Sequence, residues 1–176
     1  MHHQARKIDA AVAFIHLAER GGWQLAGATE DDVEKLMSWF RSAADVDRWG
    51  GPRFRYPFTG KTFRRDCHWG RMPSYRLNSP QGEFSAFGQM YLRYGRINLA
   101  RLVVNPQMRG KGIGKRLVAS LIETGSSLFD AKEFSLFSYR HNAAALGCYQ
   151  SMGFVIHDYP EGAPMADECF YLIRPV

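Results

Sequence analysis

The sequence predicts an α/β (α+β) protein, and three observations support this fold class. The chain has 176 residues, which is enough to bury a hydrophobic core within one domain. Hydrophobic residues make up 45% of it, as is typical of a globular protein rather than of a disordered chain. Short apolar runs of strand character alternate with segments in which apolar residues recur at helical spacing. There is no internal repeat, no low-complexity tract and no sign of a second domain.

The predicted elements follow one another with clear boundaries. An N-terminal helical extension, residues 1–22, holds a helix over 5–20 that two glycines terminate. Residues 23–176 form the single domain. Its strands are predicted at 23–28, 75–78, 84–94, 96–104, 134–139, 154–158 and 168–174, and its helices at 29–40, 113–128 and 142–152. Residues 41–73 are rich in glycine, proline and aromatic residues, which indicates a loop with short helical pieces.

The strand predicted at 96–104 has an irregular apolar pattern. Ile97 and Leu99 occupy odd positions, whereas Leu102 and Val104 occupy even positions. A β-bulge near Arg101 would produce this shift, because a bulge adds one residue to one strand. A central strand that is buried on both faces would also explain it, and the sequence leaves both interpretations open.

A glycine-rich turn follows this strand and leads into the helix at 113–128. Gly110, Gly112 and Gly114 stand at alternate positions. The free N–H groups of a first helical turn attract anions, and glycines let a phosphate approach the backbone. The turn departs from a Walker A loop, which needs Ser or Thr where Arg116 stands, and from the dinucleotide fingerprint, which needs glycine where Lys115 stands. We therefore expect a different phosphate-bearing ligand, with an ordinary basic turn as the alternative.

Two motifs, taken together, resemble one known family. The first is Q-x-x-G-x-G, spelled by Gln107, Gly110 and Gly112. The second is N-x-x-A-x-x-x-Y-x-x-x-G-F over residues 142–154, with a good helix N-cap at Asn142 and a terminating glycine near its end. In this order they resemble the pyrophosphate loop and the second cofactor-binding segment of the GNAT superfamily of acyl-CoA-dependent N-acetyltransferases. The resemblance is strong over residues 97–155 and faint elsewhere.

This resemblance implies a fold, a reaction and a set of site residues. The fold would be a mixed, largely antiparallel sheet of six to seven strands with helices on both faces, in which splayed strands form the acyl-CoA cleft. The reaction would be direct transfer of an acetyl group from acetyl-CoA to a primary amine in a ternary complex, with Tyr149 as the catalytic acid and no metal. The cofactor-binding residues would be Leu102, Val103, Val104, Gln107, Arg109, Gly110, Lys111, Gly112, Ile113, Gly114, Lys115 and Asn142.

The motifs do not identify the general base. Many GNAT members have a glutamate on the strand before the glycine turn, but the polar residues there are Asn98 and Arg101. A water relay is one alternative. Candidates by residue type alone are Asp66, His68, Glu83, His141 and Glu168.

The acceptor is expected to be a small-molecule amine or a peptide N-terminus. The segment R-W-G-G-P at 48–52, which follows Trp39, looks like GNAT members allied to the ribosomal-protein N-terminal acetyltransferases. We expect the surrounding insert to wall the acceptor site, and its many arginines to favour an acceptor that also has a negative charge. Two other functions stay open: an acyl-CoA-binding regulatory module without catalysis, and a transferase for a longer acyl group.

The formal net charge of +6 has two local sources. One is the cluster around the predicted phosphate site, and the other is a run of arginines between residues 48 and 76 that alternates with aromatic residues. Such a mixture suits stacking on nucleic-acid bases, but it suits packed side chains with solvated arginine heads as well. We favour the second interpretation, so nucleic acid is not the expected partner.

Cysteine use and hydropathy bear on the compartment. Cys67, Cys148 and Cys169 lie far apart and form no C-x-x-C pair. No apolar run approaches the length of a membrane span, and no A-x-A cleavage site follows the N-terminal apolar patch. We therefore expect a cytoplasmic protein without a membrane partner, and leave a homodimer open.

Overall fold

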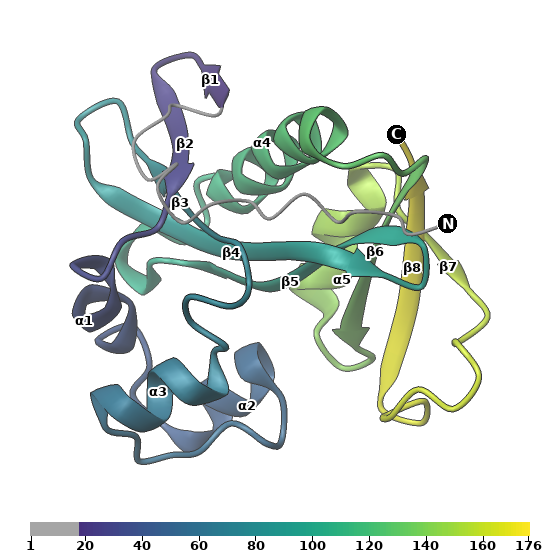
Figure 1. Ribbon diagram of the computed structural model, residues 1–176, viewed down its shortest axis with the longest axis horizontal. Coiled ribbons are helices and arrows are strands. Elements are labelled where there is room, and N and C mark those ends of the chain that lie inside the picture. The colour runs from purple at the N-terminus through teal and green to yellow at the C-terminus, as the bar shows by residue number, and fades with distance from the viewer. Residues whose placement is uncertain (1–17) are drawn as a thin grey trace, which may run out of the picture.

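The computed structural model describes residues 18–176, which form one eight-stranded sheet with helices on both faces (Figure 1). The strands are β1 (Ala18–Arg20), β2 (Trp23–Gly27), β3 (Ser74–Asn78), β4 (Phe84–Arg93), β5 (Arg96–Val104), β6 (Glu133–Tyr139), β7 (Val155–His157) and β8 (Cys169–Pro175). The helices are α1 (Asp32–Met37), α2 (Ala43–Gly50), α3 (Gly60–Asp66), α4 (Ile113–Leu128) and α5 (Ala143–Ser151), and a 3-10 turn, η1 (Pro106–Met108), precedes α4.

The strand order is β1-β2-β3-β4-β5-β6-β8-β7. All neighbouring strands pair antiparallel except β5 and β6, which are parallel because α4 carries the chain back between them. The predicted class, a mixed and largely antiparallel sheet, is therefore confirmed. The sheet has one strand more than the six to seven predicted, since the short β1 extends its edge.

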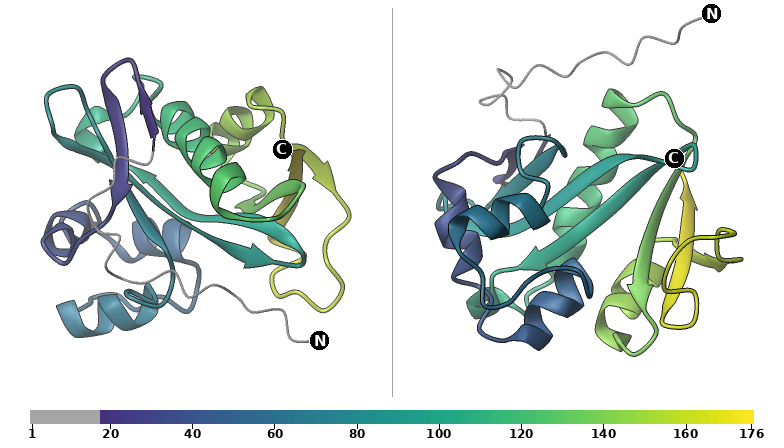
Figure 2. Two further views of the ribbon diagram at one scale, coloured as in Figure 1. Left: turned by 45° about the horizontal axis from the view of Figure 1, so that its top comes forward. Right: turned by 60° about the horizontal axis from the view of Figure 1, so that its bottom comes forward.

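Helices cover the two faces of the sheet in separate groups (Figures 1 and 2). On one face, α4 and α5 pack on a core in which Leu117 and Leu121 of α4 meet Met90 and Phe134 of the sheet. On the other face, α1, α2 and α3 enclose a second core that includes Phe63, fully buried, and residues of β4 and β5. Strand β5 therefore runs between two hydrophobic cores.

The segment at 41–73, predicted as a loop with short helical pieces, contains the two short helices α2 and α3. Thr59 caps α3 in a reciprocal capping box with Thr62, which explains why so short a helix begins there. Aromatic side chains of this segment face inward: Trp49 stacks on Phe63 with ring centroids 5.7 Å apart, and Phe54 is 8% exposed. The aromatic residues thus serve the second core, as the packing interpretation of this segment predicts.

The helix predicted at 5–20 is wrong at its C-terminal end. Residues 18–20 form β1, which pairs antiparallel with residues 23–25 across a turn at Gly21 and Gly22. Sheet pairing outweighs the helical spacing here because both glycines adopt the left-handed conformation that a tight turn needs. The rest of that predicted helix lies outside the described residues, and the division into an extension and a domain at residue 22 stays a prediction.

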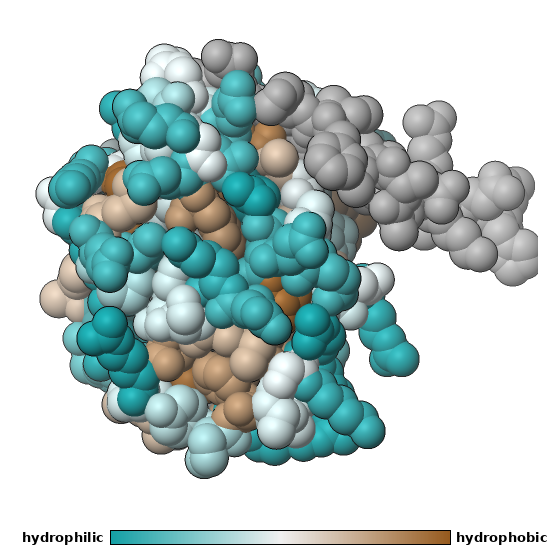
Figure 3. All heavy atoms as spheres, turned by 90° about the vertical axis from the view of Figure 1, so that its left-hand side faces the viewer, coloured by the Kyte–Doolittle hydropathy of each residue, from teal (hydrophilic) through white to brown (hydrophobic). Residues whose placement is uncertain are grey.

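Surface character adds one constraint. None of the helices within residues 18–176 is both long enough and apolar enough to cross a membrane. On the face shown in Figure 3, hydrophilic residues separate smaller hydrophobic areas from one another. Among the described residues, that face therefore presents no single broad apolar surface.

Candidate active site

Strand β5 contains a β-bulge at Arg101. Phe87 of β4 pairs with Val103, whereas Gln89 pairs with Ala100, so Arg101 and its neighbour oppose a single residue of β4. Arg101 has φ +49°, a left-handed conformation that few residues other than glycine adopt. The bulge inferred from the shifted apolar pattern is therefore confirmed. The other interpretation, a strand buried on both faces, holds as well, because Leu102 packs on one core and Val103 on the other.

A glycine on β4 makes room for this bulge. A Cβ at Gly88 would lie 2.8 Å from Cδ2 of Leu102 and 3.0 Å from Cδ1 of Leu121. A larger residue at this position would force these two leucine side chains to shift. Beyond the bulge, Leu102 and Val104 pack toward α4 while Val103 turns to the opposite core. The change of face follows from the one extra residue.

Strands β5 and β6 stop pairing with each other before either strand ends. They pair only over Ile97–Leu99 and Phe134–Leu136, after which β5 continues to Val104 and β6 to Tyr139. A cleft of about 290 Å³ lies where they diverge. Its walls come from both strands, from the start of α5 and from residues 48–51 at the end of α2. The predicted splay of two neighbouring parallel strands is thus present.

The glycine turn ends in a helix start whose amides are free. Gly112 is the N-cap of α4, with φ +73°, and no side chain caps this helix. Gly110 is also left-handed at +77°, and a Cβ at either glycine would meet no atom within 4 Å. Within residues 18–176, the backbone N–H groups of residues 112–115 have no hydrogen-bond acceptor. Open space, free donors and the positive end of the helix dipole together suit an anion.

Tyr149 on α5 reaches the cleft. Asn142 caps α5 through a hydrogen bond from the Ala145 amide to its Oδ1 at 3.3 Å, as predicted, and it also lines the cleft. The Tyr149 ring packs edge-on against Phe154, with centroids 6.3 Å apart. Burial, and secondarily the neighbouring Cys148, raise the pKa of the Tyr149 hydroxyl. The phenol is therefore protonated near neutral pH and can donate a proton.

A tryptophan that sequence reasoning did not assign to the site holds the bulge in place. Nε1 of Trp49 donates a hydrogen bond to the backbone carbonyl of Arg101 at 2.7 Å. The two residues are 52 positions apart in the sequence, so the bond ties α2 directly to the irregular part of β5. The R-W-G-G-P motif contains Trp49, but nothing in the sequence indicates this partner.

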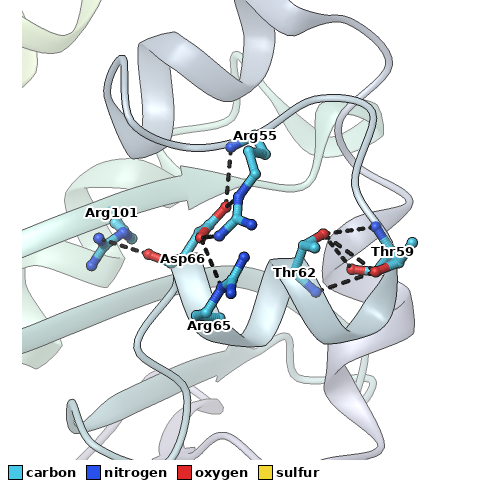
Figure 4. Close-up of polar contacts among 6 residues, drawn as sticks. All are labelled: Arg55, Thr59, Thr62, Arg65, Asp66 and Arg101. Carbon is cyan, nitrogen blue, oxygen red and sulfur yellow. Dashed lines mark hydrogen bonds and ion pairs between the residues drawn. The ribbon is translucent and has the colours of Figure 1, made fainter.

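The side chain of Arg101 points away from the free edge of β5 into a polar network. Its guanidinium donates to Oε1 of Gln89 at 2.9 Å and to the carbonyl of Asp66 at 3.2 Å. Figure 4 shows this contact at the C-terminal end of α3, where the Asp66 carboxylate binds Arg55. Hydrogen bonds from Arg55 lower the pKa of Asp66. Asp66, one of the five candidate bases, is therefore committed to an ion pair.

None of the five candidate bases lines the cleft. Glu83 lines a different hollow beside α1, and His68 follows α3 at the surface. His141 is exposed, with its ring 5.1 Å from that of Tyr139, and Glu168 is exposed just before β8. Asn98, on the strand where relatives have a glutamate, is buried and accepts a hydrogen bond from Ser135 at 3.3 Å. No carboxylate or imidazole is among the described residues that line the cleft.

One residue that lines the cleft, Tyr139, contacts a carboxylate that does not line it. The Tyr139 hydroxyl, at the end of β6, lies 3.3 Å from both carboxylate oxygens of Asp47 on α2. Burial, followed by the charge of Asp47, raises the pKa of Tyr139. Neither residue stood out in the sequence, since 92 positions separate them. This pair joins the α2 wall of the cleft to the β6 wall.

Most of the predicted site residues lie in the cleft, along β5 or in the turn that follows this strand. Leu102, Asn142 and Tyr149 line the cleft. Val103 and Val104 continue β5 away from it, and the glycine turn with α4 follows at the end of that strand. Gln107 is exposed in η1 and lines a separate hollow beside α1. Of the remaining residues predicted in the glycine turn, Ile113 is buried. The others are exposed or partly exposed: Arg109, Gly110, Lys111, Gly112, Gly114 and Lys115.

The bulged strand, the parting of parallel strands and the glycine turn at a helix start are the features that the resemblance of the two motifs implies. The model of the Acetyltransferase (GNAT) family matches residues 35–154 of this chain. The protein therefore belongs to the GNAT acetyltransferase family.

Individual relatives are distant. The spermine/spermidine N(1)-acetyltransferase of Bacillus subtilis is 26% identical in a match of 96 residues that covers 51% of this chain and 62% of that enzyme, so the match spans less than two thirds of the relative. The spermidine N-acetyltransferase of Vibrio cholerae, solved with CoA and spermine, has a TM-score of 0.67 at 12% identity, covering 89% of this chain and 96% of that one. The ribosomal-protein-S18-alanine N-acetyltransferase of Escherichia coli has a TM-score of 0.61 at 20% identity, covering 88% and 94%. These structures share the fold.

Proposed function

We propose that the protein is an N-acetyltransferase that moves an acetyl group from acetyl-CoA to a primary amine by direct attack in a ternary complex. The observation that carries this proposal is the parting of β5 from β6 at the bulge, which opens a cleft on the same strand that leads to the uncapped start of α4. Family membership supports the same reaction class. The acceptor would be a small-molecule amine or a peptide N-terminus.

The residues present fit acetyl-CoA along its length. Free amides at residues 112–115 suit its diphosphate, and left-handed Gly110 and Gly112 leave the approach open. Lys115 and Arg109 are exposed beside this turn and can screen the phosphate charge. Residues 102–104 have no strand partner on the β6 side, so their backbone can pair with the pantetheine amides as an added strand would.

Bound there, acetyl-CoA would supply an activated acyl carbon at the cleft. Tyr149 holds a proton on its hydroxyl, and we assign it the role of donor to the departing sulfur. The acceptor amine has to be neutral to attack, so it first loses a proton, and its nitrogen loses a second one as the carbon–nitrogen bond forms and the carbon–sulfur bond breaks. Since the described residues lining the cleft include no carboxylate or histidine, we assign both protons to water in the cleft, from which Tyr149 regains the proton that it gives to the sulfur. Alignment of the two reactants can lower the barrier by about 7–11 kcal/mol.

A cytoplasmic location is part of the same proposal. Cys67, Cys148 and Cys169 are all free thiols in the structure. Free cysteines are typical of a reducing compartment. Fractionation of cells that express the protein would test this part alone.

Ligand-dependent melting tests the cofactor directly. A ligand at about 100 times its dissociation constant stabilises a protein by roughly 2.7 kcal/mol, which raises the melting midpoint of a domain of this size by roughly 5–10 °C. We expect this shift with acetyl-CoA and CoA and none with ATP or NAD. Longer acyl-CoAs in the same series test the rival acyl group, and release of free thiol with an amine panel separates a transferase from a binding module. A shift with NAD or ATP instead would refute the proposal.

A further inference from the structure

We propose that the acceptor has an anionic group, such as a carboxylate, besides its amine, and that Arg48 and Arg93 bind this group in the cleft. The inference rests on the proposed function, because it names the chemical class of the second substrate. It draws on the charge that lines the cleft, on the position of the phosphate turn and on the pairing of the arginines.

The cleft is lined by one sign of charge only. Three of its described residues are arginines, Arg48, Arg93 and Arg101, and none is an aspartate, glutamate or lysine. A cleft with low-dielectric walls concentrates the field of such charges and attracts anions. An acceptor with several positive charges would be repelled there.

Acetyl-CoA does not account for these arginines. Its phosphates are expected at the start of α4, and no residue of 106–115 lines the cleft. That turn has basic residues of its own in Arg109, Lys111 and Lys115. The thioester end, which is the part expected at the cleft, is uncharged. The positive charge in the cleft therefore faces the other substrate.

Arg93 is held in place without a counter-ion. Its guanidinium carbon lies 4.7 Å from the centroid of the Phe137 ring and 5.0 Å from that of Tyr94. Within residues 18–176 it has no carboxylate partner, although two comparably buried arginines, Arg76 and Arg96, each form an ion pair. The aromatic faces fix the position of this guanidinium, and one of its N–H groups donates to the Tyr94 hydroxyl at 3.4 Å, which leaves the other N–H donors for an acid.

Arg48 and Arg101 differ in how many of their guanidinium N–H donors are free to bind an anion. The guanidinium of Arg101 is already bonded to Gln89 and to a carbonyl of α3. Arg48 is exposed at the end of α2, with no ion pair to any residue in the described part of the chain. Arg48 of α2 and Arg93 of β4 are thus the two arginines of the cleft with most of their N–H donors available.

Two carboxylates lie near these groups without lining the cleft. Asp47 contacts the Tyr139 hydroxyl, and the charge of Glu168 acts on the same tyrosine. An α-amino acid or an acidic peptide N-terminus has an ammonium that this pair can receive and an acid that the arginines can bind. A polyamine would meet three guanidinium groups in a lining whose described residues include no carboxylate, so we expect this chain to differ in acceptor from its Bacillus subtilis relative, which is named for spermine and spermidine.

Matched acceptors test the proposal. A set of α-amino acids is compared with the corresponding α-amides and with spermidine, at saturating acetyl-CoA, by the release of free thiol. We expect kcat/KM to be higher for the acids by roughly tenfold to a hundredfold, the range of one charge-assisted hydrogen bond. Arg48→Gln and Arg93→Gln should each raise KM for the acids and erase the preference, with KM for acetyl-CoA unchanged.

Two further variants separate charge from folding. Arg48→Lys keeps the positive charge and should retain part of the preference. Arg53→Gln removes an exposed arginine of the same insert that does not line the cleft, so its kinetics should match the wild type. Equal or faster acetylation of the amides or of spermidine, or an unchanged preference in both glutamine variants, would overturn the proposal and leave the acetyltransferase function standing.

If no acceptor reacts, the proposed function is overturned, and a binding measurement then tests the anion site alone. Melting midpoints are compared in the presence of CoA. N-acetyl amino acids should raise the midpoint more than their amides do, and Arg93→Gln should abolish the difference. An equal shift with both ligands would overturn the inference as well.

Discussion

Replacing Trp49 by phenylalanine removes one hydrogen bond from the bulge and keeps an aromatic ring in the second core. The indole donates to the Arg101 carbonyl at 2.7 Å, and a buried acceptor that loses its donor costs about 1–3 kcal/mol. Trp39 provides the matched control. It packs in the same core at 5% exposure, but its Nε1 is buried with no partner in the described part of the chain. Trp39→Phe therefore loses ring volume without losing a hydrogen bond.

The two variants should differ in both stability and cofactor binding. We expect Trp49→Phe to be less stable than Trp39→Phe by about 1–3 kcal/mol, which for a domain of this size lowers the melting midpoint by roughly 2–12 °C. Because the lost bond holds β5 where the pantetheine arm is expected, acetyl-CoA affinity should fall by about tenfold for every 1.4 kcal/mol of distortion. Urea unfolding and titration with acetyl-CoA measure the two effects. Equal stability and equal affinity in the two variants would refute the role given to the Trp49 bond.

Three other predictions follow from the same geometry. Gly112 and Gly95 have φ of +73° and +72°, with open space around both. Replacing either glycine by alanine should lower the stability by about 1–2 kcal/mol, but only Gly112→Ala should weaken the binding of acetyl-CoA, as measured by calorimetric titration. Tyr149→Phe should slow turnover by about 10²–10⁴-fold at unchanged acetyl-CoA affinity; unaltered single-turnover rates would remove it from the mechanism. Burial raises the pKa of Cys67 from 9.0 to about 12. The unfolded chain therefore releases this proton at lower pH than the folded one, and the free energy of unfolding falls as the pH rises from 9 to 12. Denaturant titrations should show a shallower fall for Cys67→Ala.

Much of the sheet and of the cofactor half of the site could be predicted from local patterns. The strand predicted at 96–104 has the bounds of β5, and the helix after the glycine turn has those of α4. The bulge is visible because alternation is a property of neighbouring residues. Likewise the N-cap at Asn142 and the left-handed Gly110 depend on residues within one turn of the chain.

Other features depend on long-range contacts that local preference does not show. Residues 18–20 have helical spacing, yet they pair with residues 23–25 because the edge of the sheet offers partners, and the helix predicted there is wrong. The segment at 41–73 was predicted as a loop with short helical pieces, and α2 and α3 are such pieces, stabilised by the aromatic core beneath them. The five carboxylates and imidazoles named as candidate bases by residue type alone do not line the cleft.

By itself the sequence determined the order of the elements, the bulged strand and the glycine turn that starts α4, since each depends on residues close together in the chain. Only the tertiary structure decided how α2 closes over that strand. The Trp49–Arg101 bond spans 52 positions of the sequence and the Asp47–Tyr139 contact spans 92, and no pattern among neighbouring residues predicts contacts over such separations. The arginines of the cleft, too, come from α2, β4 and β5, and it is the packing of the sheet that places their charges around one volume.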